Sequence, residues 1–202
     1  MPTIYDLKPR FQRLLRPLVA RLAAAGITPN QITVLAFLLS LLTGCLLFWR
    51  PESAWPLLLI PPVLFVRMAL NAIDGMLARE HDLRTPLGAL LNEVGDVLSD
   101  AALYLPLGVV PGVNGTAVAV FVVLAVVTEL AGAVAVQIGA SRRYDGPLGK
   151  SDRAFAVGVI TLLLGLGLTP GGWLTAVWAL LSLLLLVTIV NRVRRALKEV
   201  ER

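Results

Sequence analysis

The stretch NAIDGMLAREHDLRTPLGALLNEVGDVLSD, residues 71–100, concentrates carboxylates, amides and arginines in a chain that is otherwise strongly apolar. Of the 202 residues, 57% are hydrophobic and 15% are charged, whereas about a quarter of the residues are charged in average soluble domains. Polar and ionisable side chains are costly in lipid, so within a membrane-spanning helix they mark functional positions. We therefore expect the chemistry in this stretch, and the rest of the chain predicts an all-α integral membrane protein.

Six apolar runs are long enough to suggest membrane-spanning helices, because a hydrocarbon core of roughly 30 Å requires about 20 apolar residues of a helix. The predicted spans lie at about residues 32–49, 55–73, 86–110, 116–140, 154–168 and 173–190. Together they predict a bundle of six transmembrane helices.

The basic residues predict how this bundle is oriented. Nearly all of the 18 lysines and arginines lie in the N-terminal segment, the second and fourth connections and the C-terminal tail; the exceptions are Arg50 and Arg67. The positive-inside rule then places both termini in the cytoplasm of a multi-pass protein of the cell (inner) membrane. The net charge of +5 follows from this topology and from attraction to anionic lipid headgroups, so no nucleic-acid partner is expected.

The N-terminal segment predicts an amphipathic helix. Within residues 4–24 the apolar side chains that share one helical face are Leu7, Phe11, Leu14, Leu15, Leu18 and Leu22. Basic residues lie outside this face, which is typical of a helix in the membrane interface. The alternative is a helix that packs on the cytoplasmic side of the bundle. We therefore divide the chain into an interfacial helix, residues 1–27, and a six-helix membrane domain, residues 28–202.

Helix starts are marked by local sequence. Thr28 is expected to cap the first span, with Pro29 at the first helical position and Gln31 completing a capping box. Thr85 precedes a proline in the same way before the third span, and Ser151 is the expected cap of the fifth.

The polar residues of the opening stretch fall on two helical faces. The first set is spaced i, i+3, i+4, i+7 and the second recurs every four residues: Asn71, Asp74, Gly75 and Ala78, then Gly88, Asn92, Asp96 and Asp100. Two antiparallel helices joined by a short turn bring such faces opposite each other. Carboxylate and amide oxygens without His or Cys favour a hard cation such as Mg²⁺, Mn²⁺ or Ca²⁺ over zinc. The small residues alone are also explained by a helix-packing seam.

The same stretch resembles the signature of the CDP-alcohol phosphotransferase (CDP-alcohol phosphatidyltransferase) family, written D-x2-D-G-x2-A-R-x8-G-x3-D-x3-D. The matching positions, at the family's spacing, are Asp74, Gly75, Ala78, Arg79, Gly88 and Asp96. Asn71 and Asn92 stand at the first and third aspartates of the signature. The six-span topology, the interfacial first helix and the TPNQIT motif are also similar to that family, so the resemblance covers most of the chain.

This resemblance implies an enzyme. Members of the family transfer a substituted phosphate from a CDP-linked donor to an alcohol and release CMP. We therefore expect a divalent-metal-dependent transferase of phospholipid biosynthesis with CDP-diacylglycerol as donor and a small alcohol as acceptor. The expected cofactor is Mg²⁺ or Mn²⁺, as one or two ions, and the family also implies a homodimer.

The resemblance also assigns roles to residues. Asp74 would be a metal ligand and Asp96 a ligand or the catalytic base. Asn71 and Asn92 can offer a carbonyl oxygen but no charge, which favours a single ion. Asp100, one helical turn after Asp96, would compensate as a further ligand. The positions expected to receive the cytidine diphosphate are Gly75, Ala78, Arg79 and Gly88.

A structural role remains open for three of the buried charges. Arg67 lies two helical turns before Asp74 on the same face, and could form an ion pair with Asp100 or with Glu129 of the fourth span.

The basic loop before the fifth span offers an acceptor site. Lys150 and Arg153 lie where a helix begins, and could bind a phosphate on the acceptor with help from the helix N-terminus. The acceptor would then be a phosphorylated alcohol such as glycerol 3-phosphate rather than serine. The alternative is the positive charge of any cytoplasmic loop, which we favour for Arg142 and Arg143.

Two other function classes compete with the enzyme. A small transporter would use the intramembrane acids as a pathway, but the polar groups gather toward the predicted cytoplasmic end instead of crossing the bilayer. A catalytically silent lipid- or nucleotide-binding scaffold would share the enzyme's fold and would have lost metal binding.

Overall fold

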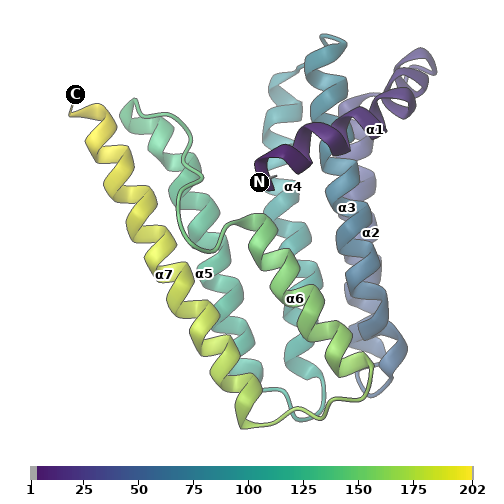
Figure 1. The fold of residues 1–202 in the computed structure, drawn as a ribbon, viewed down its shortest axis with the longest axis vertical. Coiled ribbons are helices and arrows are strands. Elements are labelled where there is room, and N and C mark those ends of the chain that lie inside the picture. Colours follow the sequence, from purple (N-terminus) through teal and green to yellow (C-terminus); the bar gives the residue numbers. More distant parts are fainter. Residues whose placement is uncertain (1–3, 202) are drawn as a thin grey trace. The chain divides into compact units, whose positions relative to one another are not determined.

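The computed structural model describes residues 4–201, with side chains from residue 10 onward. Every regular element in that range is a helix (Figure 1), which confirms the predicted all-α class. The helices are α1 (Ile4–Ala24), α2 (Pro29–Trp49), α3 (Ala54–Glu80), α4 (Pro86–Tyr104), η1 (Leu105–Val109), α5 (Gly115–Val134), η2 (Ala135–Ile138), α6 (Lys150–Gly165) and α7 (Gly172–Val200). Residues 1–3 of the predicted interfacial segment, and the side chain of Leu7, lie outside the described part.

Four of the helices among residues 4–201 are long and apolar enough to cross a membrane: α2, α3, α5 with η2, and α7. The other two predicted spans correspond to α4 and α6. Helix α4 carries Glu93, Asp96 and Asp100, and α6 has only 16 residues, which reach about 24 Å at 1.5 Å per residue. The count of six spans therefore stays a prediction.

The chain divides into two compact units. Unit 1 is Met1–Leu42 with Pro62–Ser99, and unit 2 is Thr43–Pro61 with Asp100–Arg202. Most of the signature stretch, up to Asp96, belongs to unit 1, whereas Asp100, Glu129 and Arg153 belong to unit 2.

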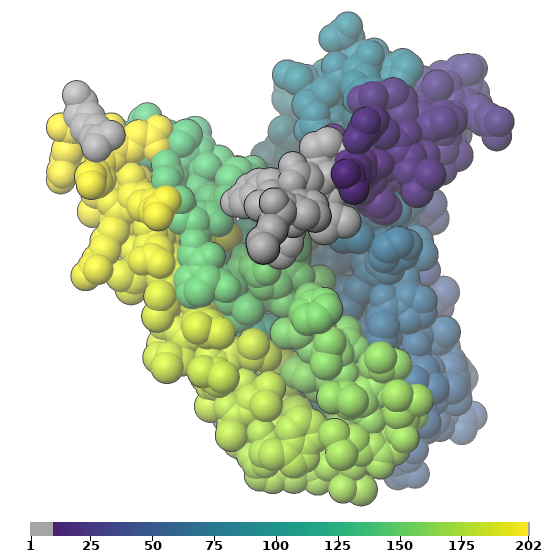
Figure 2. Space-filling view, viewed as in Figure 1, coloured from purple at the N-terminus to yellow at the C-terminus, as the bar shows by residue number. Residues whose placement is uncertain are grey.

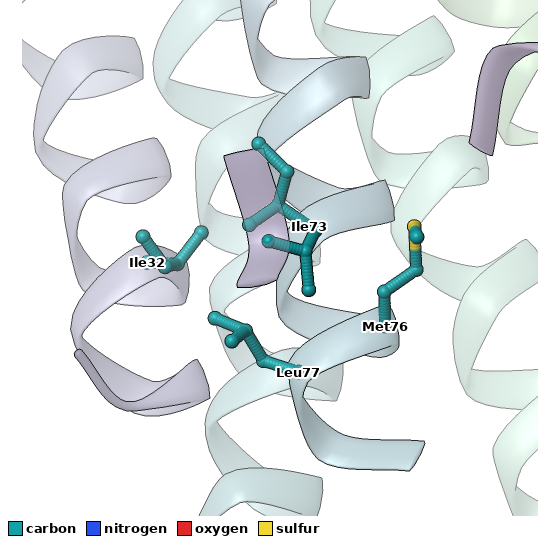
Figure 3. Packing of buried hydrophobic residues seen from close by; sticks show 5 residues of the cluster. Ile32, Ile73, Met76 and Leu77 are labelled. Atoms are coloured by element: carbon teal, nitrogen blue, oxygen red, sulfur yellow. The ribbon is translucent and has the colours of Figure 1, made fainter. Parts of the chain in front are cut away.

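Unit 1 has an apolar core to which α1 contributes. The buried members of this core are Val19, Ile32, Ile73, Met76 and Leu77 (Figure 3). Val19 of α1 is fully buried, whereas Leu14 is 76% exposed. The described part of α1 lies on the surface of its unit (Figure 2). Helix α1 thus packs on unit 1 through one side and leaves apolar side chains exposed on another, and its place in a membrane interface stays a prediction.

Two helix starts follow the sequence prediction. The Thr28 N–H donates to Gln31 Oε1 at 2.9 Å, and the Gln31 N–H donates to Thr28 Oγ1 at 3.4 Å, which is the predicted capping box. Before α4, Thr85 Oγ1 accepts a hydrogen bond from the N–H of Gly88 at 2.9 Å. These caps fix where α2 and α4 begin, and therefore which faces their polar residues occupy.

The predicted cap of α6 is wrong. Helix α6 begins at Lys150, so Ser151 lies inside its first turn. The bond at this end comes from Asp152, whose Oδ2 accepts from the N–H of Gly149 at 2.9 Å. Asp152, three residues after Gly149, thus accepts a hydrogen bond from the N–H of the residue that precedes the helix, as the acidic member of a capping box does.

Unit 2 is built around α5 and α7. Phe121 of α5 and Trp178 of α7 have ring centroids 5.0 Å apart and are almost completely buried. This apolar contact holds together the helices that carry Glu129 and Arg192.

Candidate functional site

Asp74 is held by a threonine from another helix. Thr33 Oγ1 of α2 donates to Asp74 Oδ2 of α3 at 2.9 Å, and also lies 3.1 Å from the carbonyl oxygen of Pro29. Asp74 is 5% exposed and Thr33 is 9% exposed. The Thr33 hydroxyl, in the first turns of α2, therefore orients one oxygen of Asp74. Sequence reasoning missed Thr33, because it used the TPNQIT motif only as a helix start.

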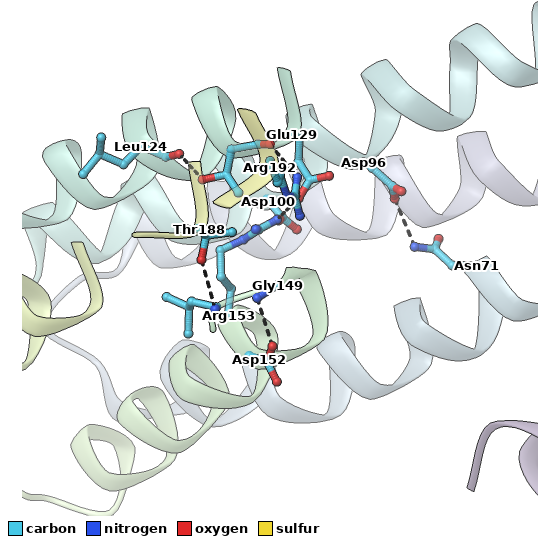
Figure 4. A network of polar contacts seen from close by, with 12 residues as sticks. Asn71, Asp96, Asp100, Leu124, Glu129, Gly149, Asp152, Arg153, Thr188 and Arg192 are labelled. Atoms are coloured by element: carbon cyan, nitrogen blue, oxygen red, sulfur yellow. Dashed lines mark hydrogen bonds and ion pairs between the residues drawn. The ribbon is translucent and has the colours of Figure 1, made fainter. Parts of the chain in front are cut away.

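Asp96 is held from α3 by two side chains. Asn71 Nδ2 donates to Asp96 Oδ1 at 3.0 Å (Figure 4). Arg67 Nη2 donates to the backbone oxygen of Asp96 at 3.0 Å and lies 3.6 Å from Asp96 Oδ1. The Arg67 side chain is 4% exposed and that of Asp96 is 23% exposed. The structure thus brings together the two polar faces that the spacing predicted, and it pairs Arg67 with Asp96.

The small residues of the signature stretch lie against polar side chains. A Cβ added to Gly75 would lie 3.0 Å from Arg79 Nη2, so the Arg79 guanidinium folds back over this glycine. A Cβ added to Gly88 would lie 2.7 Å from Asn30 Oδ1. Ala78 and Asn92 are half-buried, and Arg79 is exposed. The two glycines therefore allow amide and guanidinium groups to approach the helix backbone closely.

A second polar cluster, in unit 2, centres on Glu129. Arg153 Nη2 donates to Glu129 Oε1 at 2.9 Å and to Asp100 Oδ2 at 3.2 Å (Figure 4). Arg142 Nη2 lies 3.3 Å from Glu129 Oε2, and Arg192 Nη1 lies 3.5 Å from Glu129 Oε1. Three arginines thus converge on this carboxylate, and the alternative pairing of Arg67 with Asp100 or Glu129 stays a prediction. We call Asp100, Glu129, Arg142, Arg153 and Arg192 the arginine cluster.

The predicted acceptor residues lie at the start of α6. Arg153 is fully buried, and its Nε and Nη1 are buried without a hydrogen-bond partner. Lys150 is the first residue of α6 and is half-buried. Sequence reasoning found Arg153 but missed Arg192, because the latter lies in the basic end of α7, where positive charge is expected anyway.

Arg143 belongs to a different network near the C-terminal end of α7. It forms ion pairs with Asp145 and Glu199, and Arg195 Nη1 lies 2.7 Å from Asp145 Oδ1. Partial burial tends to raise the pKa of Asp145, but its hydrogen bonds and charge interactions with Arg143 and Arg195 outweigh this effect and hold the pKa below the usual value. A hollow of about 420 Å³ is lined by Arg143, Arg195, Lys198 and Glu199. Arg143 is thus paired with two acids of its own unit, and its interpretation as the positive charge of a cytoplasmic loop stays a prediction.

Comparison with known proteins decides the family. A family model for CDP-alcohol phosphatidyltransferases matches residues 26–190. The chain belongs to the CDP-alcohol phosphatidyltransferase family. It is therefore an enzyme, a metal-dependent phosphatidyltransferase of phospholipid synthesis.

Relatives of this phosphatidyltransferase include bacterial and archaeal proteins. It is 47% identical over 195 residues to the inner membrane protein YnbA of Escherichia coli K12, which covers 96% of each chain. It is 33% identical over 97 residues to the archaetidylinositol phosphate synthase of Pyrococcus horikoshii, which covers 48% of this chain and 49% of the other. The apolar helices and the inner membrane relative identify a multi-pass inner membrane protein.

The fold is similar to that of a solved phosphatidylinositol phosphate synthase, PgsA1 of Mycobacterium tuberculosis. The form with CDP-DAG bound has a TM-score of 0.76 and 23% identity, with 91% of this chain and 94% of that chain covered. The complex with manganese and citrate has a TM-score of 0.74 and 23% identity, with 89% and 87% covered. At this identity the likeness establishes the fold of the phosphatidyltransferase.

The residues of unit 1 suit a hard cation. Among the side chains that the structure describes, no three His, Cys, Asp or Glu groups come together as a metal site. Asp74 and Asp96 supply two carboxylates. Asn71 bonds to Asp96 through its Nδ2, so its Oδ1 does not take part in that bond. In proteins Mg²⁺ is commonly held by one or two carboxylates together with substrate phosphates. The carboxylates of Asp74 and Asp96 are therefore of the chemical type that a divalent ion such as Mg²⁺ or Mn²⁺ prefers.

Proposed function

We propose that this phosphatidyltransferase moves the phosphatidyl group of CDP-diacylglycerol to a small alcohol that itself carries a phosphate, and releases CMP. Glycerol 3-phosphate and an inositol phosphate are the two candidates. The observation that carries the acceptor class is the arginine cluster, in which the buried Arg153 and Arg192 and the half-buried Arg142 converge on Glu129. The names of the archaeal and mycobacterial relatives are those of synthases of inositol phosphate lipids.

Asp96 is the proposed catalytic base. The acceptor hydroxyl transfers its proton to the Asp96 carboxylate as its oxygen attacks the phosphatidyl phosphorus. The bond from that phosphorus to the bridging oxygen breaks, and CMP leaves with the electron pair. Arg67 and Asn71 orient Asp96 through the contacts described above. General base catalysis needs such a fixed carboxylate within hydrogen-bond reach of the hydroxyl.

Asp74 and Asp96 are the proposed ligands of the Mg²⁺ or Mn²⁺ ion, with Asn71 and Asn92 as amide-oxygen candidates. When bound, the divalent ion neutralises charge on the diphosphate and on the leaving CMP. Asp100 was a further candidate ligand. Because its Oδ2 accepts from Arg153 at 3.2 Å, we assign Asp100 to the arginine cluster instead.

The donor nucleotide is proposed to bind along the small-residue face of the signature. Gly75 and Gly88 let polar side chains approach the backbone closely. The exposed Arg79 guanidinium carries charge suited to a phosphate oxygen. We therefore keep the cytidine diphosphate on this face, at Gly75, Ala78, Arg79 and Gly88.

The acceptor phosphate is proposed to bind the arginine cluster with Lys150 and Arg153. Arg153 is fully buried, and its Nε and Nη1 have no hydrogen-bond partner among the described residues. A buried donor without an acceptor is costly, and a phosphate oxygen of the acceptor could accept from either atom. Lys150 at the first turn of α6 adds charge where a helix N-terminus already favours an anion.

Three further features remain proposals. They are the six-span topology, the cytoplasmic position of both termini and the homodimer. The basic residues at the predicted cytoplasmic ends support the orientation. The homodimer rests on the family alone.

CMP release from the purified protein tests the reaction. The assay supplies CDP-diacylglycerol, Mg²⁺ or Mn²⁺, and paired acceptors with and without phosphate: glycerol and glycerol 3-phosphate, inositol and inositol phosphate, and serine. We expect release only with one phosphorylated acceptor and only with metal. Asp96→Asn should abolish release, whereas Glu93→Gln removes a carboxylate from the same helix outside the signature and should retain it.

Other outcomes separate the competing functions. Use of serine or of an unphosphorylated alcohol would overturn the acceptor class while leaving the enzyme in place. A folded protein that binds CDP-diacylglycerol but releases no CMP with any acceptor would favour the silent scaffold.

A further inference from the structure

The segment between η2 and α6 takes part in two sets of ion pairs in unit 2. Arg142 belongs to the arginine cluster, where its Nη2 lies 3.3 Å from Glu129 Oε2. The next residue, Arg143, pairs instead with Asp145 and Glu199. We call this second set the outer network, and its members are Arg143, Asp145, Arg195 and Glu199. Neighbouring residues of one segment therefore serve a buried cluster and a more exposed network.

Asp145 contacts both sets. Its Oδ1 accepts from Arg195 Nη1 at 2.7 Å, and its Oδ2 accepts from Arg143 Nε at 2.8 Å. Its backbone oxygen accepts from Arg192 Nε at 3.3 Å. Arg192 is 1% exposed, and its Nη1 lies 3.5 Å from Glu129 Oε1. One residue thus joins the outer network to a buried guanidinium of the arginine cluster.

The spacing of the two arginines on α7 makes this double contact possible. Arg192 and Arg195 are three residues apart, so they are neighbours on one helical face. When the Asp145 carboxylate is held by Arg195, the backbone oxygen of the same residue is held beside Arg192. Hydrogen bonds between ionised partners are about twice as strong as neutral ones. The carboxylate of Asp145 is therefore the stronger anchor, and the backbone contact to Arg192 depends on it.

Close packing on both sides would pass a shift of the segment on to the arginine cluster. The Arg143 N–H donates to the backbone oxygen of Gly132 in α5 at 3.1 Å, and a Cβ on Gly132 would lie 3.0 Å from Arg192 Nη1. On the α7 side, a Cβ on Gly146 would lie 2.4 Å from a side-chain carbon of Thr188. Closely packed interiors transmit strain, so a displaced Asp145 should alter the position of Arg192.

We propose that Asp145 is a positioning residue for the acceptor phosphate, and that it acts through Arg192. The proposal rests on the proposed function, since the arginine cluster is the proposed site of that phosphate. Asp145 holds the segment through its carboxylate, and its backbone oxygen fixes the direction of the Arg192 guanidinium. The residues proposed for the metal and the nucleotide belong to unit 1, so the role of Asp145 concerns the acceptor and not CDP-diacylglycerol.

Asp145→Asn tests the proposal in the CMP-release assay with Mg²⁺, because it keeps the shape of the side chain and removes its charge. The KM of each substrate is measured with glycerol 3-phosphate and with inositol phosphate as acceptor, and inorganic phosphate is titrated as a competing inhibitor. We expect the acceptor KM and the inhibition constant of phosphate to rise together by about tenfold. The KM of CDP-diacylglycerol and kcat at saturating acceptor should stay unchanged.

Two further variants make the test specific. Glu201→Gln is the matched control, because it removes one negative charge from an exposed position at the same end of α7 and should leave every constant unchanged. Arg195→Gln breaks the contact to Asp145 Oδ1 from a side chain that is 65% exposed, and should raise the acceptor KM and the inhibition constant of phosphate in the same direction. It carries the test if Asp145→Asn does not fold.

The possible outcomes separate this inference from the proposed function. Unchanged acceptor KM and phosphate inhibition in the folded variants would overturn the role of Asp145 and leave the proposed function intact. An equal rise in the KM of CDP-diacylglycerol would show a general structural effect and would also overturn it. A wild-type chain that uses an unphosphorylated alcohol and is not inhibited by phosphate would overturn the proposed acceptor class, and this inference with it.

Discussion

The hydrogen bond from Thr33 to Asp74 provides the sharpest test of the candidate site. Thr33→Val removes the hydroxyl that donates to Asp74 Oδ2 at 2.9 Å and keeps the β-branched shape of the side chain. Hydrogen bonds to charged groups contribute about 1.5–3 kcal/mol. Loss of a group that orients a metal ligand costs about 10- to 100-fold in metal affinity, which is about 1.4–2.7 kcal/mol at 1.36 kcal/mol per tenfold. The two estimates agree, so we expect Mn²⁺ affinity to fall by one to two orders of magnitude.

The assay is a Mn²⁺ titration followed both by direct binding and by CMP release. Thr33→Ser should restore the affinity, because it restores the hydroxyl. Ser40→Ala is the control: Ser40 is fully buried in the same unit, but its Oγ donates at 2.8 Å to the backbone oxygen of Ala36 in its own helix. It should leave metal affinity unchanged. If Thr33→Val binds Mn²⁺ as tightly as the wild type, Thr33 does not position a metal ligand and the assignment of Asp74 fails.

Three further predictions concern stability. Gly44→Ala should lower Tm at a cost of about 1–3 kcal/mol, because the added Cβ would lie 1.9 Å from the backbone oxygen of Ala102. Gly172→Ala is the control, since its added Cβ meets nothing within 4 Å and should leave Tm unchanged. If both variants have the same Tm, the clash at Gly44 is refuted. The pKa of Asp145 is lowered in the folded protein, so its ionised carboxylate stabilises the fold above the unfolded-state pKa, and this stabilisation is lost as pH falls through the folded-state pKa. Asp145→Asn should therefore make the fall of Tm at acid pH less steep, which a series of Tm measurements against pH would show. Arg16→Ala breaks an exposed ion pair with Glu80, whose side chains are 55% and 35% exposed, and should cost less than about 1 kcal/mol; a large fall in Tm would show that this pair holds α1 in place.

The sequence by itself determined the features that depend on neighbours along the chain. The all-α membrane class follows from the length of the apolar runs, and the starts at Thr28 and Thr85 follow from capping chemistry within one turn. The family was recognisable because the matching residues of its signature keep their spacing within residues 71–100. Even the approach of the faces of Asn71 and Asp96 was predictable, since two helices joined by a short turn must be antiparallel neighbours.

Only the tertiary structure decided which polar groups are partners. Thr33 and Asp74 are 41 residues apart, and nothing in the helix start of α2 indicated that its hydroxyl would meet a carboxylate of α3. Arg153 was predicted as an acceptor residue, but its place between Asp100 and Glu129 depends on which sides of α4, α5 and α6 face each other. A charge in an apolar environment pairs with the opposite charge that packing brings within reach, and packing joins residues distant in sequence. Local pattern therefore identified the chemical groups, and the fold chose their partners.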